Sequence, residues 1–525
     1  MPKPVLIAGA AMTPFGRATK KLMDLLTGAA EAALKQAGLS DVDAIYLGVM
    51  NAEEFVGEGN LAVALTDRLG LSGAAGSRIE TASSTGAGAL ESAFYAVASG
   101  YLENVLVVAG EKMTGLSTSV TTRILAEVIA PGERRYGASM PSLAALIARA
   151  YARRHGLTED QLRDALGAVA VKNHARGALN PLAQFRKEIS LAAHHQAKMV
   201  SDPLGLFDCA PITDGAAAVV LSNRRGSVRL AGMGHATDSA AVTRRGSLVS
   251  FNSTRKAAAQ AYAMAQVQPS EIDFAEVHDA FTMFEIIGSE DLGFFPPGQG
   301  WRAAVEGRTG PEGTLPINPS GGLKARGHPV GASGLAQVVE AYWLLTGQVD
   351  PNRRLPRNPE VALTQSIGGL GNNNLVTVLT PAGRPLHRPG WQPEYDLPLI
   401  PASPPRPDPP PGETVGRLLA ATVLHAPPQG FAAPLKLGLV RASGGWQTLV
   451  HLLDEGPAEP GDSLQLTMEN GLYKARAISA LNRPWQEALM SWRRLPTTLR
   501  LWRRRAMRLR ARAAPDKTAG GPPEA

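Results

Sequence analysis

A single histidine, His328, lies within the glycine-rich stretch NPSGGLKARGHPVGASG at residues 318–334, directly ahead of an apolar run. Pro319 and the neighbouring glycines predict a bent backbone around it, and glycine allows a ligand or a strand to approach closely. A histidine in such a turn could act as a general base. This hypothesis needs partners for His328 from other parts of the chain.

The first part of the chain alternates strand-like and helix-like runs. Strands are predicted at Val5–Ala11 and Ala44–Met50, with an amphipathic helix at Lys20–Ala37 between them. Residues 78–113 then read as strand, tight turn, alanine-rich helix and strand. This alternation predicts an α/β fold with a largely parallel sheet covered by helices.

A similar alternation resumes near Ser227 and ends at the glycine-rich stretch. The segments STGAGALESAFYAVASG and VGASGLAQVVEAYWLLTG share a small-residue turn, an amphipathic helix and a terminal glycine. We therefore expect two similar halves, with Ser83 and His328 at equivalent helix entrances. The second half ends in two strands joined by a Gly/Asn turn.

The remaining chain differs in composition. Residues 381–411 contain twelve prolines, which predicts an extended linker. Five short strand-like runs follow and suggest a small β-barrel. The expected division is 1–226 and 227–380 for the two halves, with 115–205 as a lid insertion, 381–412 for the linker, 413–482 for the barrel and 483–525 for a basic helical tail.

Charge and cysteine content narrow the class of protein. From Trp485 onward nine Arg and one Lys face three acidic residues, so the tail carries the whole net charge of +7. This argues against nucleic acid as a partner of the main domain, although the tail could contact an anionic surface. One cysteine, Cys209, excludes an intrachain disulfide and a cysteine-rich zinc site. Without a signal peptide or a membrane-spanning stretch, we expect a soluble cytoplasmic protein.

Six motifs in order along residues 1–381 resemble the thiolase superfamily, in particular the branch of sterol-carrier-protein thiolases and acetyl-CoA acetyltransferases. The resemblance implies a duplicated five-layer α/β/α/β/α fold, a homodimer, and C–C bond chemistry on an acyl-CoA thioester without a permanently bound cofactor or a metal. The motifs are SSTGAGAL at 83–90, VVAGEKM at 107–113, DPLGLFDCAPITDGAAAVVLS at 202–222, VHDAFT at 277–282, the stretch at 318–334 and SIGGLGNNN at 366–374.

The resemblance also shows what this sequence lacks. Ser83 occupies the position of the family's nucleophilic cysteine, and Ser366 occupies the position of a second cysteine that moves the α-proton. In the sterol-carrier branch that second cysteine falls near Ala280, which is not a cysteine either. Cys209 lies in a different segment and reads as a small buried thiol.

Other family positions are retained. His328 matches the histidine that activates the nucleophile, and His278 matches a residue of the first oxyanion site. The backbone N–H groups of Ser83 and Gly368 match the second oxyanion site, and Gly369 follows them. The resemblance therefore implies that an oxyanion or an enolate can still be stabilised.

The C-terminal barrel resembles the OB-fold domain of acyl-CoA-associated proteins that accompany thiolases. The similarity runs over residues 416–467, and the zinc ribbon that often precedes this domain has no counterpart here. It implies a role in docking an acyl-CoA-processing partner enzyme or in CoA access.

Three functions remain open. The first is acyl transfer, with Ser83 as nucleophile and His328 as general base. The second is retro-aldol, retro-Claisen or decarboxylating chemistry without a covalent intermediate. The third is a catalytically silent subunit that binds acyl-CoA or a partner protein. The sequence alone favours the acyltransferase class and leaves the acyl chain unspecified.

Overall fold

The computed structural model describes residues 2–385, 390–395, 398–401, 414–453 and 458–478. Nine strands form one sheet in the order β3-β2-β4-β7-β1-β8-β11-β10-β9. Their bounds are β1 Leu6–Met12, β2 Ala44–Gly48, β3 Ala75–Ile79, β4 Asn104–Glu111, β7 Gly215–Ser222, β8 Val228–Thr237, β9 Phe274–Glu276, β10 Ala362–Gly368 and β11 Asn373–Pro381.

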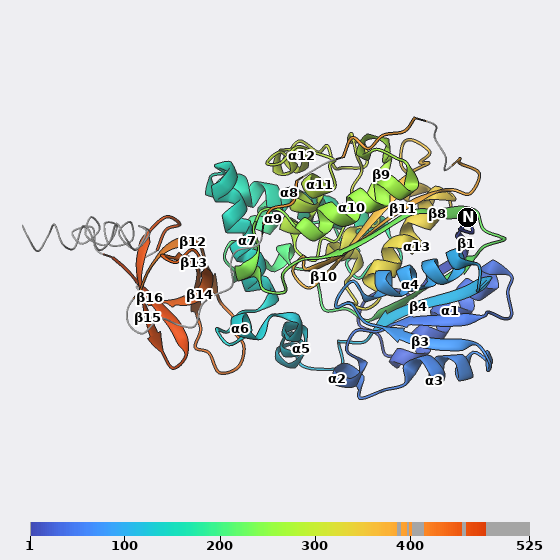
Figure 1. Cartoon of the computed structure of the whole chain (residues 1–525), viewed down its shortest axis with the longest axis horizontal. Coiled ribbons are helices and arrows are strands. Elements are labelled where there is room, and N and C mark those ends of the chain that lie inside the picture. The colour runs from blue at the N-terminus through green and yellow to red at the C-terminus, as the bar shows by residue number, and fades with distance from the viewer. Residues whose placement is uncertain (1, 386–389, 396–397, 402–413, 454–457, 479–525) are drawn as a thin grey trace, which may run out of the picture.

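The two halves of this sheet meet where β1 pairs with β8 over only two residue pairs. In Figure 1, α3 lies below β3 and β4, the helices α4 and α13 lie above these strands, and β8, β11 and α10 lie above α13. Helix α10 packs against β8 and β11. This order confirms the predicted five layers. The helices are α1 Leu22–Ala37, α3 Leu61–Arg68, α4 Thr85–Ser99, α10 Asn252–Ala265 and α13 Ser333–Leu345.

The expectation of a largely parallel sheet was wrong. Only β2–β3, β2–β4 and β9–β10 are parallel pairs, whereas the pairs of β7, β8 and β11 are antiparallel. A helical crossover makes neighbouring strands parallel, but β7 returns only after a long excursion and β11 follows β10 through the predicted Gly/Asn turn.

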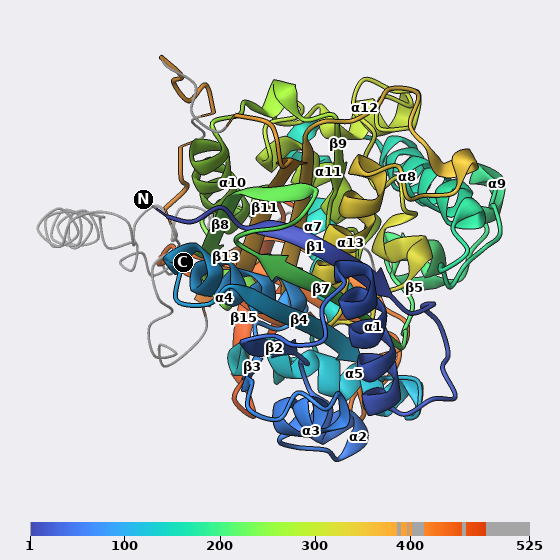
Figure 2. The ribbon, with the colours of Figure 1, turned by 90° about the vertical axis from the view of Figure 1, so that its right-hand side faces the viewer.

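The excursion between β4 and β7 contains most of the remaining helices and wraps around one end of the sheet. Figure 2 shows α8 and α9 beside the second half and α5 level with β3 of the first half. Its elements are α5 Thr118–Leu125, α6 Pro131–Arg134, α7 Met140–His155, α8 Glu159–Leu179, α9 Leu191–His195, β5 Met199–Ser201 and β6 Leu204–Gly205; elsewhere lie α2 Ala52–Val56, α11 Thr282–Asp291 and α12 Gly300–Val305.

The predicted five-stranded barrel is present and closed. Strands pair in the circular order β12-β13-β14-β16-β15, and β12 returns to β15. Its apolar interior is continuous with residues of α7, so barrel and body share one core. The strands are β12 Thr414–Leu424, β13 Leu435–Ala442, β14 Gln447–Leu452, β15 Ser463–Glu469 and β16 Leu472–Ala477. The predicted basic tail lies outside the described residues.

The two central helices approach each other closely at their N-terminal ends. A Cβ atom on Gly86 would lie 2.8 Å from the carbonyl oxygen of Gly331 and 2.9 Å from the backbone nitrogen of Leu335. A Cβ atom on Gly334 would lie 2.6 Å from Ser366 Oγ. The glycines of the two similar motifs therefore allow the helix entrances, with Ser83 and His328, to meet.

We expect Gly86→Ala to lower the free energy of unfolding by about 1–3 kcal/mol, because the added methyl group overpacks the contact between α4 and α13. Gly28→Ala is the matched control, since Gly28 lies in helix α1 and a Cβ atom added there would meet nothing within 4 Å. The control should be neutral or stabilising by up to about 1 kcal/mol. Urea unfolding measures both variants, and equal stability of the two would contradict the close packing.

Candidate active site

A mostly apolar cavity of about 200 Å³ lies beside the entrances of the two central helices. Three of the predicted site residues, Ser83, His278 and His328, line this cavity, as does Gly369. The apolar lining includes Met50, Met113, Leu125, Met140, Phe281 and Phe284. The structure thus brings together residues from both halves of the chain.

The side chain of His328 is held in one tautomer. Its Nδ1 atom lies 2.7 Å from Ser333 Oγ, and the Ser333 hydroxyl donates to the carbonyl oxygen of Pro329 at 2.9 Å. Because that hydroxyl has one proton, Ser333 Oγ must accept a hydrogen bond from His328 Nδ1–H. The unprotonated Nε2 atom is then left to face the cavity.

Burial and the nearby Arg326 lower the pKa of His328 to about 3. The imidazole is therefore neutral at physiological pH and can accept a proton at Nε2. Its backbone N–H donates to Thr213 Oγ1 at 2.9 Å, which fixes the turn on the opposite side.

His278 presents the complementary group. The N–H of Ile367 donates to His278 Nδ1 at 3.2 Å, so the proton of a neutral ring lies on Nε2. Burial, His328 and Arg326 hold the pKa of His278 well below its usual range. The two imidazole rings are perpendicular, with centroids 5.1 Å apart. A proton acceptor and an N–H donor therefore stand side by side at the cavity.

The residue after His278 fixes the loop that carries His328. The Asp279 carboxylate accepts hydrogen bonds from the N–H of Leu323 at 2.6 Å and of Lys324 at 3.2 Å. A side chain on Gly322, whose φ is 60°, would collide with this carboxylate. The pair His278-Asp279 thus supplies one group to the cavity and one anchor to the turn of π-helix at Gly322–Arg326.

Ser83 is buried at the cavity, but its hydroxyl is not directed at a base. Ser83 Oγ donates to the carbonyl oxygen of Ile367 at 2.9 Å. The preceding residue, Ala82, has a φ of 55°, a left-handed conformation that costs a non-glycine residue about 1–3 kcal/mol. This turn sets Ser83 just before α4, where the sequence predicted a nucleophile.

Ser366 and Gly368 lie on β10 and are not among the residues that line the cavity. The Oγ atom of Ser366 is buried against the first turn of α13, without a hydrogen-bond partner in the described part of the chain. A Cβ atom on Gly368 would lie 2.5 Å from the carbonyl oxygen of Thr81. Gly368 therefore packs against the turn that carries Ser83.

Cys209 also lines the cavity. Burial and the neighbouring Asp208 raise the pKa of its thiol to about 12, so this cysteine supplies no thiolate at neutral pH. His194 hydrogen-bonds to Asp208 at 2.8 Å through Nε2. Among the described residues, no group of three or more His, Cys, Asp or Glu side chains could hold a metal ion.

Sequence reasoning missed three supporting residues: Ser333, Thr213 and Asp279. Ser333 and Asp279 lie inside motifs that were recognised, but only the folded geometry reveals that they hold His328 and its loop. Thr213 also lies in a recognised motif, at 202–222, and only the structure shows that its hydroxyl accepts the backbone N–H of His328.

The barrel supports one wall of the cavity. Tyr136, fully buried before α7, accepts a hydrogen bond at its backbone oxygen from His451 Nε2 at 2.9 Å. Its Oη atom accepts from the N–H of Tyr473 at 3.1 Å. Met140 and Pro141, a few residues farther on, line the cavity. Strands β14 and β16 are therefore tied to the segment that closes the site.

Comparisons with known proteins agree with this architecture. Residues 5–225 match the family description "Thiolase, N-terminal domain", and residues 234–381 match "Thiolase C-terminal domain-like". An acetyl-CoA acetyltransferase of Methanothermobacter thermautotrophicus is 36% identical over 386 residues, which cover 72% of this chain and 99% of the relative. The chain belongs to the thiolase family.

Two further relatives of this thiolase-family chain carry different names. The sterol carrier protein 2 of Bos taurus is 31% identical over 399 residues, covering 71% of this chain and 72% of the relative. The solved structure titled "Ltp2-ChsH2(DUF35) aldolase" aligns with a TM-score of 0.63 and 23% identity, covering 73% of this chain and 99% of that chain. At that identity the likeness shows the shared thiolase fold alone.

No helix within the described ranges combines the length and the apolar character needed to cross a membrane. The predicted cytoplasmic location stays a prediction.

We expect His328 to remain neutral, with its proton on Nδ1, from about pH 8 down to about pH 5, whereas an unperturbed histidine titrates near about 6.5. Because the lowered pKa disfavours the imidazolium, acid should not charge this ring before the pH falls far below neutrality. Nitrogen chemical shifts of ¹⁵N-histidine-labelled protein measure both properties. Ser333→Ala should remove the tautomer preference, and a titration of wild-type His328 near the ordinary histidine pKa would contradict the assignment.

Proposed function

We propose that this protein makes or breaks a carbon–carbon bond beside a CoA thioester without a covalent acyl-enzyme, as an aldol-type lyase. The observation that carries the proposal is the pairing of a neutral His328, with Nε2 open to the cavity, and His278, with Nε2–H available as a donor. Together they form an acid/base and oxyanion pair that needs no nucleophile.

In the cleavage direction the substrate is a β-hydroxyacyl thioester. His328 Nε2 takes the proton of the β-hydroxyl group, the O–H electrons form the carbonyl of the leaving ketone or aldehyde, and the Cα–Cβ bond breaks. Its electron pair moves through Cα to the thioester oxygen and gives an enolate. The Nε2–H of His278 stabilises this oxygen, and His328 returns the proton to Cα, so atoms and charge balance.

A second pair of donors stabilises the same negative charge on the thioester oxygen of the enolate. We assign the backbone N–H groups of Ser83 and Gly368 to it by resemblance to the thiolase family; Ser83 lines the cavity, and Gly368, which does not, packs against the turn at Thr81. Gly369 lines the cavity next to them. We retain Ser366 only as a weaker candidate, since its hydroxyl contacts α13.

Acyl transfer through Ser83 is the second candidate function, and the position of Ser83 at the start of α4 favours it. Against it, the Ser83 hydroxyl donates to Ile367 O, and a serine needs a base at the moment of attack. A silent acyl-CoA-binding subunit is the third candidate. The neutral base and the oriented donor are more than binding alone requires.

The substrate class is an acyl-CoA whose reacting part is small and apolar. The cavity volume of about 200 Å³ is below the roughly 300–1,000 Å³ that drug-sized ligands occupy. We propose no permanently bound cofactor. We also propose a homodimer through β3, because this edge strand is exposed at Ala75–Ser77 and carries unpaired backbone groups on its outer side.

We expect Ser83→Ala to keep catalysis within about tenfold, whereas His328→Asn should lower kcat by about 100-fold or more, because it removes the general base. Retro-aldol turnover of β-hydroxyacyl-CoA thioesters is followed by acyl-CoA release, and intact mass reports any acyl adduct. Product without adduct is the expected result. An adduct mapped to Ser83, with turnover lost in Ser83→Ala, would support acyl transfer instead. Measurable CoA binding without turnover would support the third candidate, a catalytically silent acyl-CoA-binding subunit.

A further inference from the structure

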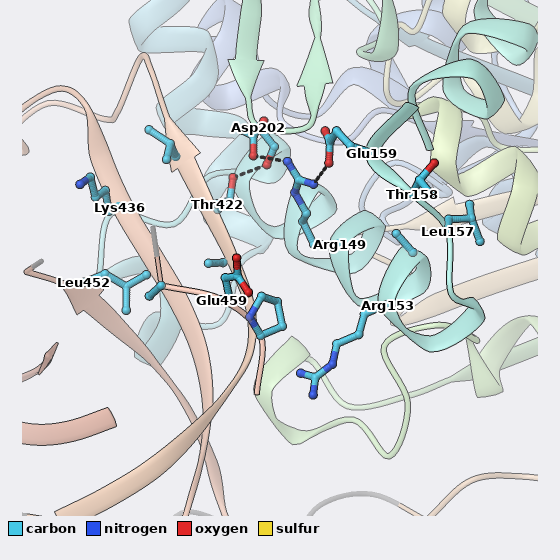
Figure 3. A pocket seen from close by; sticks show the side chains of 15 residues that line it. Arg149, Arg153, Leu157, Thr158, Glu159, Asp202, Thr422, Lys436, Leu452 and Glu459 are labelled. Atoms are coloured by element: carbon cyan, nitrogen blue, oxygen red, sulfur yellow. Dashed lines mark hydrogen bonds and ion pairs between the residues drawn. The ribbon is translucent and has the colours of Figure 1, made fainter. Parts of the chain in front are cut away.

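Two grooves lie where the barrel meets α7, and they differ in charge. In the first, of about 720 Å³, the guanidinium of Arg149 forms ion pairs with both Glu159 and Asp202. Figure 3 shows Arg149 between these two carboxylates, with Thr422 of the barrel beside Asp202. The positive charge of Arg149 in this first groove is therefore compensated within the protein.

The second groove, of about 740 Å³, lies between the C-terminal end of α7, the loop at residues 245–250 and strands β12 and β13. Arg154 on α7 and Arg441 on β13 both line it. Both side chains are exposed, and neither forms an ion pair with any residue that the structure describes. No carboxylate among the described residues therefore pairs with the positive charge of Arg154 or of Arg441 in this second groove.

Arg255 adds a buried charge to the second groove. It is 8% exposed, and its Nε atom has no hydrogen-bond partner among the described residues. Its Nη1 atom reaches Ser250 Oγ only at 3.4 Å. A guanidinium buried to this extent loses its hydration, so an unpartnered nitrogen at a groove indicates a place for an acceptor.

The barrel places a further arginine beside Arg441. Arg417 of β12 is the direct cross-strand partner of Arg441, and Arg417 is also exposed. Like charges directly opposite each other on an antiparallel pair are destabilising. A bound anion would relieve this repulsion.

Two carboxylates lie at the back of the groove, and the charge of Asp291 partly offsets that of Arg255. Asp291 accepts hydrogen bonds from Ser250 Oγ and from the N–H of Phe251, both at 2.6 Å. Glu290 accepts from the N–H of Gly300 at 2.8 Å and from the hydroxyl of Tyr151. Both carboxylates are thus already engaged with other donors.

A favourable interaction with the dipole of α7 accounts for only part of this pattern. Arginines near a helix C-terminus are stabilising, which covers Arg154, one residue before the end of α7. The helix dipole does not explain the positions of Arg441 and Arg417, which lie on strands, or of the buried Arg255.

We propose that this second groove binds the phosphate groups of a nucleotide-like phosphate ester. A guanidinium group binds two phosphate oxygens at once, and the arginines of α7 and of the barrel can together hold two phosphate groups. Leu248, Val249 and Leu419 supply apolar surface for the organic part of the ligand. Because Arg441 and Leu419 belong to the barrel, the site is complete only when the barrel is docked.

Two sources share this chemistry: the phosphates of a bound CoA thioester, and a free nucleotide that acts apart from the substrate. The first source rests on the proposed function. The length of α7 is compatible with one CoA thioester that reaches both the catalytic cavity and the second groove. Met140 at one end of α7 lines the catalytic cavity, and Arg154 lies fourteen residues farther along the helix. That separation is about 20 Å along the helix axis.

Isothermal titration calorimetry of the full chain with adenosine 3′,5′-bisphosphate, CoA and pantetheine tests the proposal. We expect Arg154→Ala and Arg441→Ala each to weaken binding of the phosphate ligands by about tenfold. Arg476→Ala is the matched control, because Arg476 is exposed on barrel strand β16 away from this groove. Pantetheine, which lacks phosphates, should show no difference between the variants.

Arginine-dependent binding of the bisphosphate alone would support a free nucleotide ligand. Arginine-dependent binding of CoA, with or without binding of the bisphosphate, would support the phosphates of the substrate. Binding of both ligands that is unchanged in the two variants, or no binding of either ligand, would overturn the proposal. Retro-aldol turnover in that same preparation would show that the proposed function survives.

Discussion

The close approach of α4 and α13 is the constraint on which the site depends. Gly86 and Gly334 lack the side chains that would keep the two helix entrances apart. The turn before α4 and the turn before α13 can then share one cavity. Two similar halves of one chain thereby combine a serine from the first half with a histidine from the second.

The electrostatics of the cavity follow from this packing. Burial and Arg326 keep both imidazoles neutral, and the hydrogen bonds of Ser333 and Ile367 assign their protons to different ring nitrogens. One ring therefore accepts a proton while its neighbour donates a hydrogen bond. Neither Ser83 nor Cys209 is activated as a nucleophile in this environment, and this favours chemistry without a covalent intermediate.

Periodicity and turn residues predicted the alternating elements, the β10–β11 turn and the closed barrel, because each depends on local sequence. The directions of β7 and β11 were not predicted, since a long excursion and a hairpin override the rule for helical crossovers. The motifs identified Ser83, His278 and His328 as neighbours. They could not show that Ser83 Oγ bonds to Ile367 O, that Ser366 faces α13, or that Ser333 sets a tautomer, because single hydrogen bonds depend on tertiary geometry.

Deuterium exchange at Cα of a non-cleavable acyl-CoA in D₂O is the most direct test of a base and an oxyanion site that work without a nucleophile. Mass spectrometry of the recovered acyl-CoA measures the incorporation. The account predicts exchange by the wild type and by Ser83→Ala, and loss of exchange in His328→Asn. Exchange that survives in His328→Asn, or that disappears in Ser83→Ala, would contradict it.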